Sequence, residues 1–252
     1  MFIPLHDANT LKRIKLQYVT LGIIGFNIAV YLFGFFGGVA REEVAILGFG
    51  LIPSTISGIA ERPDFMVIVP DLATFATYGF LHGGLLHLGG NMLFLWVFGD
   101  NVEDAMGHAR FVLFYLACSV AGGAVHFLVA PDSQVPLIGA SGAIAGVVAA
   151  YLVLHPRVKI WILAFGRIPL RLPAWIALAL WIVFQIGMFL FFPEDQVSWA
   201  AHVGGILCGG VLVFLLRLPE IPLMDSTIVT PRAVVTDAQV RSVPRVRRRV
   251  SP

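Results

Sequence analysis

The feature that most constrains this chain is a series of long apolar windows that contain no Asp, Glu, Lys or Arg. A helix that crosses a hydrocarbon core about 30 Å thick needs about 20 consecutive, mostly apolar residues. Hydrophobic residues make up 58% of the sequence and charged residues 13%, whereas a soluble domain carries about 25% charged residues. The sequence therefore predicts an all-α integral membrane protein with six spans. The windows are 18–40, 75–99, 111–130, 137–154, 174–192 and 197–216.

Two of the windows are irregular. Window 75–99 begins with a polar stretch around His82, so we expect its firm helical part to start at Leu85. Window 137–154 is short and lies near the lower limit for a straight crossing. No window repeats another, so the internal repeats that are typical of transporters are not evident.

The positive charges predict the orientation in the membrane. Six spans place both termini on one side, and that side then holds all of the 17 Lys and Arg residues except Arg41 and Arg62. Short cytoplasmic loops carry an excess of Lys and Arg. We therefore expect both termini in the cytoplasm and the start of window 137–154 near the outer face.

The same pattern divides the chain into three parts. Residues 1–17 are predicted as a cytoplasmic N-terminal segment that leads into an uncleaved signal anchor. Residues 18–217 form the membrane domain, in which the apolar loop 41–74 is expected to lie partly in the interface. Residues 218–252 read as a disordered basic tail, whose arginines either anchor the topology or touch anionic lipid.

Polar side chains inside the windows are functional candidates, because polar groups at membrane depth are costly. His87 and Asn91 are four residues apart and share one helix face. Ser141 lies in the small-residue stretch "GASG", between Gly139 and Gly142.

The last window carries a third polar group. His202 is followed by Gly205 and Gly209 on the same face, and small residues allow close helix packing in membranes. We expect this face to meet Ser141, Ala145, Val148 and Ala149 and to bring Ser141 within hydrogen-bond reach of His202. The residues expected to pack helices near the site are Gly139, Gly142, Gly205 and Gly209.

These residue types fit serine hydrolysis. A serine nucleophile needs a general base, and its transition state needs donors for a developing oxyanion. Glu194 and Asp195 lie in the loop before the last window and are too distant for a catalytic triad, so His202 would act in a dyad. No metal or other cofactor is expected, since "HGGLLH" lacks the glutamate and the spacing of a zinc protease.

Several alternatives remain at this point. Ser141 alone is typical of helix packing, and Asn91 alone is typical of interhelical hydrogen bonding. A transporter could use His87, Asn91 and His202 as a polar pathway, although no charge at membrane depth supports one.

Three ordered motifs make the chain resemble the rhomboid family of intramembrane serine proteases, in particular its bacterial, six-span type. They are His87-Leu-Gly-Gly-Asn91, Gly139-Ala140-Ser141-Gly142, and Ala201-His202-Val-Gly-Gly205 followed by Gly209. The resemblance covers roughly residues 1–217, including the "IPLHD" start.

The resemblance implies a role for each matching position. Ser141 is similar to the family's nucleophile and His202 to its base, while His87, Asn91 and the backbone N–H of Ser141 resemble the oxyanion hole. It implies a bundle with a half-immersed first loop, a buried short fourth span below a water-filled cavity, and a gate and cap formed by the fifth span and "PEDQVS". It also implies membrane-protein substrates cut near their outer ends, a bacterial inner membrane as the location, and no nucleic-acid partner.

The sequence differs from the family pattern at two places, and one alternative function is compatible with the resemblance. Ala145 stands where many members carry an aromatic ring that stacks on the catalytic histidine, so another side chain must orient His202. The Trp-Arg pair that some members have in the first loop is not evident. The rival is a non-enzymatic rhomboid-like protein that binds membrane clients, which an intact Ser141 and His202 argue against.

Overall fold

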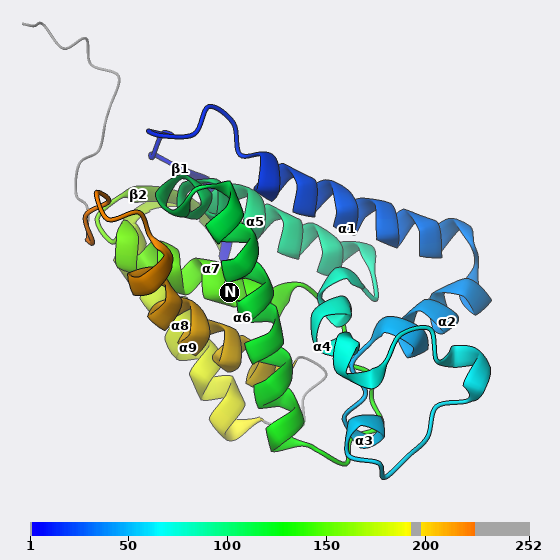
Figure 1. The fold of residues 1–252 in the computed structure, drawn as a ribbon. Helices are drawn as coiled ribbons and strands as arrows, with labels where there is room; N and C mark the ends of the chain where they lie inside the picture. The colour runs from blue at the N-terminus through cyan, green and yellow to red at the C-terminus, as the bar shows by residue number, and fades with distance from the viewer. Residues whose placement is uncertain (1, 193–197, 225–252) are drawn as a thin grey trace, which may run out of the picture.

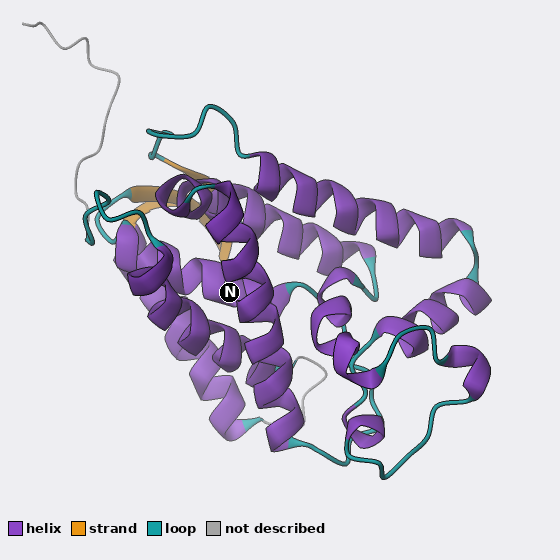
Figure 2. Cartoon of the chain, in the orientation of Figure 1, coloured by secondary structure: helices purple, strands orange, loops and turns teal. Residues whose placement is uncertain are grey.

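The computed structural model describes residues 2–192 and 198–224 (Figure 1). The expected cap loop around Glu194 and Asp195, and the tail from residue 225 onward, lie outside the described residues. Helices dominate, and a small sheet lies at one end of the bundle (Figure 2). The longer helices are α1 (Tyr18–Phe36), α2 (Val39–Phe49), α5 (Leu85–Met106), α6 (His108–Val129), α7 (Ser141–Leu154), α8 (Ala174–Phe191) and α9 (Trp199–Leu216). The short elements are α3 (Pro53–Ile56), α4 (Thr74–Thr77) and the 3-10 turns Asp64–Met66, Asp71–Ala73 and Tyr78–Phe80.

Each of the six predicted windows overlaps one main helix. Two bounds differ from the prediction, because α5 continues past Gly99 to Met106 and α6 begins at His108 instead of Phe111, so both helices include charged residues outside the windows. Four of these helices, α1, α6, α8 and α9, are long and apolar enough to cross a membrane. The segment Asp64–Phe80 and α5 meet the same test together, across a bend of 81°. By length and composition the described residues therefore contain four or five candidate spans, and α7 is a shorter apolar helix. The expected helix start at Leu85 is confirmed.

The shortest of these helices occupies the centre of the bundle. α7 contacts α5, α6, α8 and α9, and its closest neighbours are α9 and α6. All of its residues from Gly142 to Tyr151 are buried, and Leu154 at its end is buried as well. Because protein surrounds α7, the unpaired backbone groups at its two ends are shielded from lipid. Such groups are tolerated at membrane depth only where protein or water covers them.

The expectation of an all-α protein is incomplete, because three strands form an antiparallel sheet in the order β1-β2-β3. β1 (Phe2–Asp7) pairs with β2 (Lys159–Ala164), which forms a hairpin with β3 (Ile168–Pro173). Ile160 and Ile162 are buried and Trp161 between them is exposed, so β2 alternates as a half-buried strand does. The sequence obscured this alternation because both faces of β2 are apolar.

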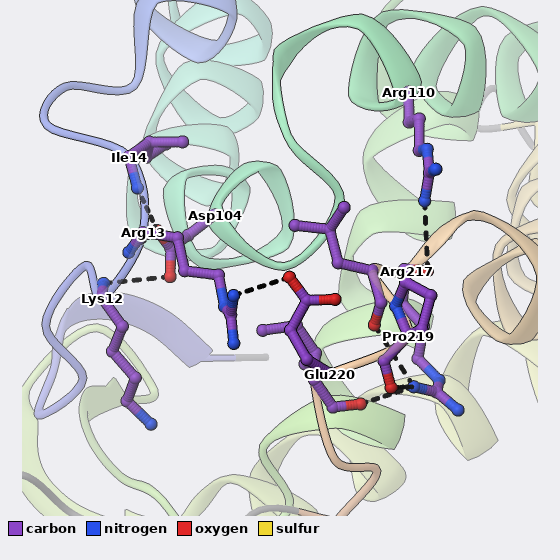
Figure 3. Close-up of polar contacts among 10 residues, drawn as sticks. Lys12, Arg13, Ile14, Asp104, Arg110, Arg217, Pro219 and Glu220 are labelled. Carbon is purple, nitrogen blue, oxygen red and sulfur yellow. Dashed lines mark hydrogen bonds and ion pairs between the residues drawn. The ribbon is translucent and has the colours of Figure 1, made fainter.

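Carboxylates of α5 attach the N-terminal segment to this end of the bundle. Asp104 accepts hydrogen bonds from the backbone N–H groups of Lys12 (3.0 Å), Arg13 (2.7 Å) and Ile14 (2.8 Å). Figure 3 shows Asp104 facing this backbone, and Arg13 facing Glu220, which follows α9. We call this region, with the three strands and the end of α5, the sheet end.

The first loop is ordered by a buried arginine. The side chain of Arg62 is only 5% exposed and forms an ion pair with Asp71. It also donates hydrogen bonds to the backbone carbonyls of Leu47, Gly48 and Val69. A single guanidinium thus links three parts of the loop.

Candidate active site

Ser141 is the first residue of α7, and the residue two positions earlier determines its surroundings. Gly139 has φ of +122°, a conformation that favours glycine. A Cβ at Gly139 would lie 2.7 Å from Cε1 and 2.8 Å from Nε2 of His87, and 3.8 Å from Oγ of Ser141. The imidazole of His87 therefore packs on the backbone immediately before the serine. Ser141 itself is half-buried.

The segment before Ser141 is tied to the first loop. Leu137 and Leu51 form a two-way backbone pair, with N···O distances of 2.8 and 3.1 Å. The N–H of Gly139 donates to the carbonyl of Tyr78 at 3.0 Å. The entry to α7 is thus positioned by the loop and the 3-10 turn that precedes α5.

His87 and Asn91 belong to a cluster with a third member. Nδ2 of Asn91 donates to Nε2 of His82 at 2.9 Å, and both side chains are buried. The ring of His82 lies 5.1 Å from that of His87, in an edge-to-face arrangement. One amide N–H of Asn91 is therefore engaged by His82, and the other remains as a donor. Sequence reasoning gave His82 no role, although its place one turn before α5 was a signal.

His202 is buried in the first turns of α9 and is held on three sides. Its Nδ1 lies 3.1 Å from Oε1 of Gln185 on α8. The ring of Trp199 meets it edge-on at 5.6 Å, and the ring of Trp181 lies nearly parallel at 6.4 Å. Gln185 and the two tryptophans were not predicted. They surround His202 in the absence of an aromatic side chain at Ala145.

Glycines bring α7 and α9 into backbone contact. A Cβ at Gly205 would lie 1.8 Å from the carbonyl oxygen of Gly142, and one at Gly209 would lie 2.3 Å from that of Gly146. Only hydrogen fits at such positions, so neither glycine of α9 tolerates a side chain without a shift of the helices. The first turn of α7, which carries Ser141, thereby lies against the first turns of α9.

The face that makes this contact differs from the predicted one. We expected Ser141, Ala145, Val148 and Ala149 to meet the glycines of α9, and Gly142 to pack near the site. The glycines of α9 lie against Gly142 and Gly146. Ala145 and Ala149 pack beside this contact, in a cluster with Ile206. The residues expected directly opposite the glycines are therefore displaced by one position, or about 100° around the helix, because small residues on both sides of a helix do not show which side a neighbour uses.

The structure places the predicted site residues close together, but not every expected hydrogen bond among them is formed. Ser141, His87 and Gly139 are adjacent, and the helix of His202 is packed against that of Ser141. Among the described residues, no hydrogen bond joins Ser141 to His202. Hydrogen bonds between nucleophile and base are often long in unliganded enzymes and tighten when substrate binds.

Comparison with known proteins is consistent with this arrangement. A family model described as the rhomboid domain matches residues 70–219, which is more than half of the chain. The chain belongs to the rhomboid family.

Curated relatives of this rhomboid come from bacteria and from mitochondria. Rhomboid protease GluP of Bacillus subtilis is 32% identical over 142 residues, covering 56% of this chain and 25% of the relative. Rhomboid protein 1, mitochondrial, of Saccharomyces cerevisiae is 31% identical over 176 residues, covering 66% and 49%. Putative rhomboid protease YdcA of Bacillus subtilis is 26% identical over 231 residues, covering 86% and 96%. The chain thus spans a quarter and about half of the first two relatives and nearly all of the third.

Proposed function

We propose that this rhomboid is an intramembrane serine endopeptidase that hydrolyses peptide bonds in the transmembrane segments of other membrane proteins. The observation that carries the proposal is the glycine contact between α7 and α9, together with the His87 ring beside Ser141. These contacts support a nucleophile on α7, a base on α9 and an oxyanion donor on α5 that act at one site. Relatives that are named rhomboid proteases support the same reaction.

The proposed reaction proceeds in two halves. Oγ of Ser141 attacks the scissile carbonyl carbon while Nε2 of His202 takes the hydroxyl proton. The resulting oxyanion is stabilised by His87, Asn91 and the backbone N–H of Ser141, which has no acceptor within α7 because it lies in the first turn. The imidazolium then gives its proton to the leaving amine, and water, activated by the same base, hydrolyses the acyl-enzyme.

The proposal includes the topology that the charges predict. Six spans place both termini in the cytoplasm and Ser141 near the outer face, with the Arg62 loop half-immersed in the outer leaflet. A helical substrate exposes no scissile carbonyl to a nucleophile, so the substrate segment would have to unwind near its outer end. The proposal also places the protein in a bacterial inner membrane, which the similarity to bacterial relatives supports.

The test is labelling and proteolysis by the purified full chain in detergent. We expect a fluorophosphonate probe to modify Ser141 and a panel of transmembrane substrates to be cut. Both signals should vanish in Ser141→Ala and fall strongly in His202→Ala. Ser119→Ala is the matched control, since Ser119 lies in a helix of the same bundle and is buried.

The result that would overturn the proposal is equally direct. If folded wild-type protein takes no label and cuts no substrate, or if Ser141→Ala cuts as fast as wild type, the dyad is wrong. Client binding that survives in Ser141→Ala without any cleavage by wild type would favour the non-enzymatic reading.

A further inference from the structure

Gln185 is an unusual residue for its position. α8 is otherwise apolar, and side chains such as Leu180, Val183 and Phe191 are largely exposed on its surface. Gln185 is only 4% exposed and lies on the face toward α9. A buried amide at membrane depth is costly unless it is paired. The partner that the structure gives it is Nδ1 of His202, at 3.1 Å.

The chemistry of this contact bears on which nitrogen of His202 carries a proton. A neutral imidazole has one N–H donor and one lone pair. The oxygen of an amide can only accept, so a bond from His202 to Oε1 requires the proton on Nδ1. The lone pair is then on Nε2, which is the nitrogen that must take the proton of Ser141. The arrangement places an amide where serine proteases with a triad place a carboxylate.

We propose that Gln185 is a positioning residue that holds His202 in the tautomer and orientation of a general base. This inference rests on the proposed function, because it assigns Gln185 a role in the same site. Trp199 and Trp181 confine the ring plane, and Gln185 determines the rotation of the ring within that plane. Together they replace the stacking side chain that Ala145 cannot provide.

Because no carboxylate pairs with His202, replacing the Gln185 amide by a carboxylate should change the pH dependence of the reaction. His87 on α5 is the titratable group whose charge interacts with His202. No carboxylate among the described residues bonds to His202, and α8 and α9 contain none. A glutamate at position 185 would therefore introduce a negative charge, stabilise the imidazolium and raise the pH at which the base becomes available.

The experiment compares three variants of the full chain in detergent. Gln185→Met keeps the length and volume of the side chain and removes the strong acceptor. Gln185→Glu keeps the acceptor and adds a charge. Val183→Met is the matched control, since Val183 lies on the exposed surface of the same helix. Cleavage kinetics, the pH–rate profile and 15N NMR of labelled histidine are measured for each.

We expect kcat of Gln185→Met to fall about 10- to 100-fold, as for other groups that orient a reacting side chain, with KM nearly unchanged. Gln185→Glu should recover most of the lost kcat, and its acid limb should move to higher pH. Val183→Met should behave as wild type. In wild type, 15N NMR should show the proton of His202 on Nδ1, and Gln185→Met should show a mixture of tautomers.

Two results would overturn the inference while leaving the protease proposal intact. One is a wild-type kcat in Gln185→Met. The other is a proton of His202 found on Nε2 in wild-type protein that cuts in a Ser141-dependent manner. If wild type does not cut at all, the proposed function fails, and NMR alone decides the positioning role. An unchanged tautomer in Gln185→Met would then contradict it.

Discussion

Buried polar groups have different hydrogen-bond pairing at the two ends of the bundle. At the sheet end, the carboxylate of Glu103 is fully buried and lies within 3.0 Å of four donors, which belong to Val19, Thr20 and His108. Asp104 accepts three backbone N–H groups. At the Ser141 end, Nδ1 of His82 and Nε2 of His126 are buried without a hydrogen-bond partner among the described residues, whereas at the sheet end such an atom is Nε of Arg217, whose other nitrogen Nη1 donates to backbone carbonyls.

The difference in pairing indicates that the sheet end stabilises the fold and that the Ser141 end can bind a ligand. A buried polar group that is fully paired stabilises one conformation, and one that is incompletely paired retains bonding capacity for a ligand. Glu103 and Asp104 attach the start of α1 and the segment before it to the end of α5. In the proposed protease, a substrate carbonyl, an oxyanion or water would supply the missing partners around Ser141. Variants at the two ends should therefore separate stability from catalysis.

Glu103→Ala should give the largest effect and should act on stability. It leaves buried donors of Val19 and Thr20 without an acceptor, which costs about 3–5 kcal/mol in unfolding free energy. Denaturant unfolding in detergent measures this. Glu220→Ala is the control, because the Arg13–Glu220 pair is exposed, and such pairs contribute about 0–1 kcal/mol. Equal losses in the two variants would contradict the contrast between the ends.

Asn91→Ala should act on turnover. Loss of one oxyanion donor lowers kcat by about 10²–10³, equivalent to about 2.7–4 kcal/mol, and His87 with the backbone N–H of Ser141 would keep some activity. The measurement is kcat on a transmembrane substrate at a temperature where the variant is folded. An unchanged kcat would mean that Asn91 only pairs with His82 in a structural contact.

Asp7 should make the sheet end sensitive to pH. Burial raises the pKa of Asp7 to about 6 from 3.8, although hydrogen bonds from Tyr151 and from backbone groups oppose the rise. A raised pKa means that the folded protein binds the proton more tightly. The contribution of Asp7 to stability should therefore decrease by about 3 kcal/mol as pH rises from about 4 to about 6.

Asp7→Asn tests that dependence. The neutral amide keeps a hydrogen-bond acceptor for Tyr151 and Asn101 and cannot ionise. Its unfolding free energy should vary less with pH across this window than that of wild type. A wild-type pH dependence in Asp7→Asn would assign the effect to another group.

Gly205→Ala should disturb the Ser141 end by packing alone. The added methyl would meet the carbonyl oxygen of Gly142, and overpacking of this kind costs about 1–3 kcal/mol. Cleavage should fall in parallel, since α7 and α9 carry Ser141 and His202. Gly210→Ala is the control in the same helix, because a Cβ there meets nothing within 4 Å, and alanine favours helix by about 1 kcal/mol. Full activity in Gly205→Ala would show that the close contact is dispensable.

The bounds of several helices followed from hydrophobicity alone. α5 begins at Leu85, α8 begins at Ala174 and α9 ends at Leu216, as the apolar windows predict. Pro173 before α8 and Arg217 after α9 mark two of these bounds, because a proline or a charge is costly inside an apolar helix. The same rule fails at the other end of α5, which continues through Glu103 and Asp104 because hydrogen bonds pair both carboxylates. The strand β2 was missed for the converse reason, since a strand with two apolar faces carries no polar alternation in its sequence.

The local sequence around the site also had predictive value, up to a limit. A glycine before Ser141 and glycines after His202 indicated close backbone approach, and the structure shows it at Gly139, Gly205 and Gly209. Spacing along one helix shows which residues share a face, but it does not show which neighbour that face meets. For that reason Gly146, His82 and Gln185 were not assigned.

By itself, the sequence determined that this chain has membrane-length apolar helices, where they lie, and which side chains in them could perform serine hydrolysis. Those properties depend on residue type and on spacing along the chain, so they can be predicted without the tertiary structure. Only the tertiary structure decided that Gly146 faces α9, that Asn91 is paired with His82 and that His202 meets Gln185. These contacts join residues far apart in the chain, and they depend on how each helix is rotated about its axis. That rotation is set by the packing of all its neighbours at once, which no single segment encodes.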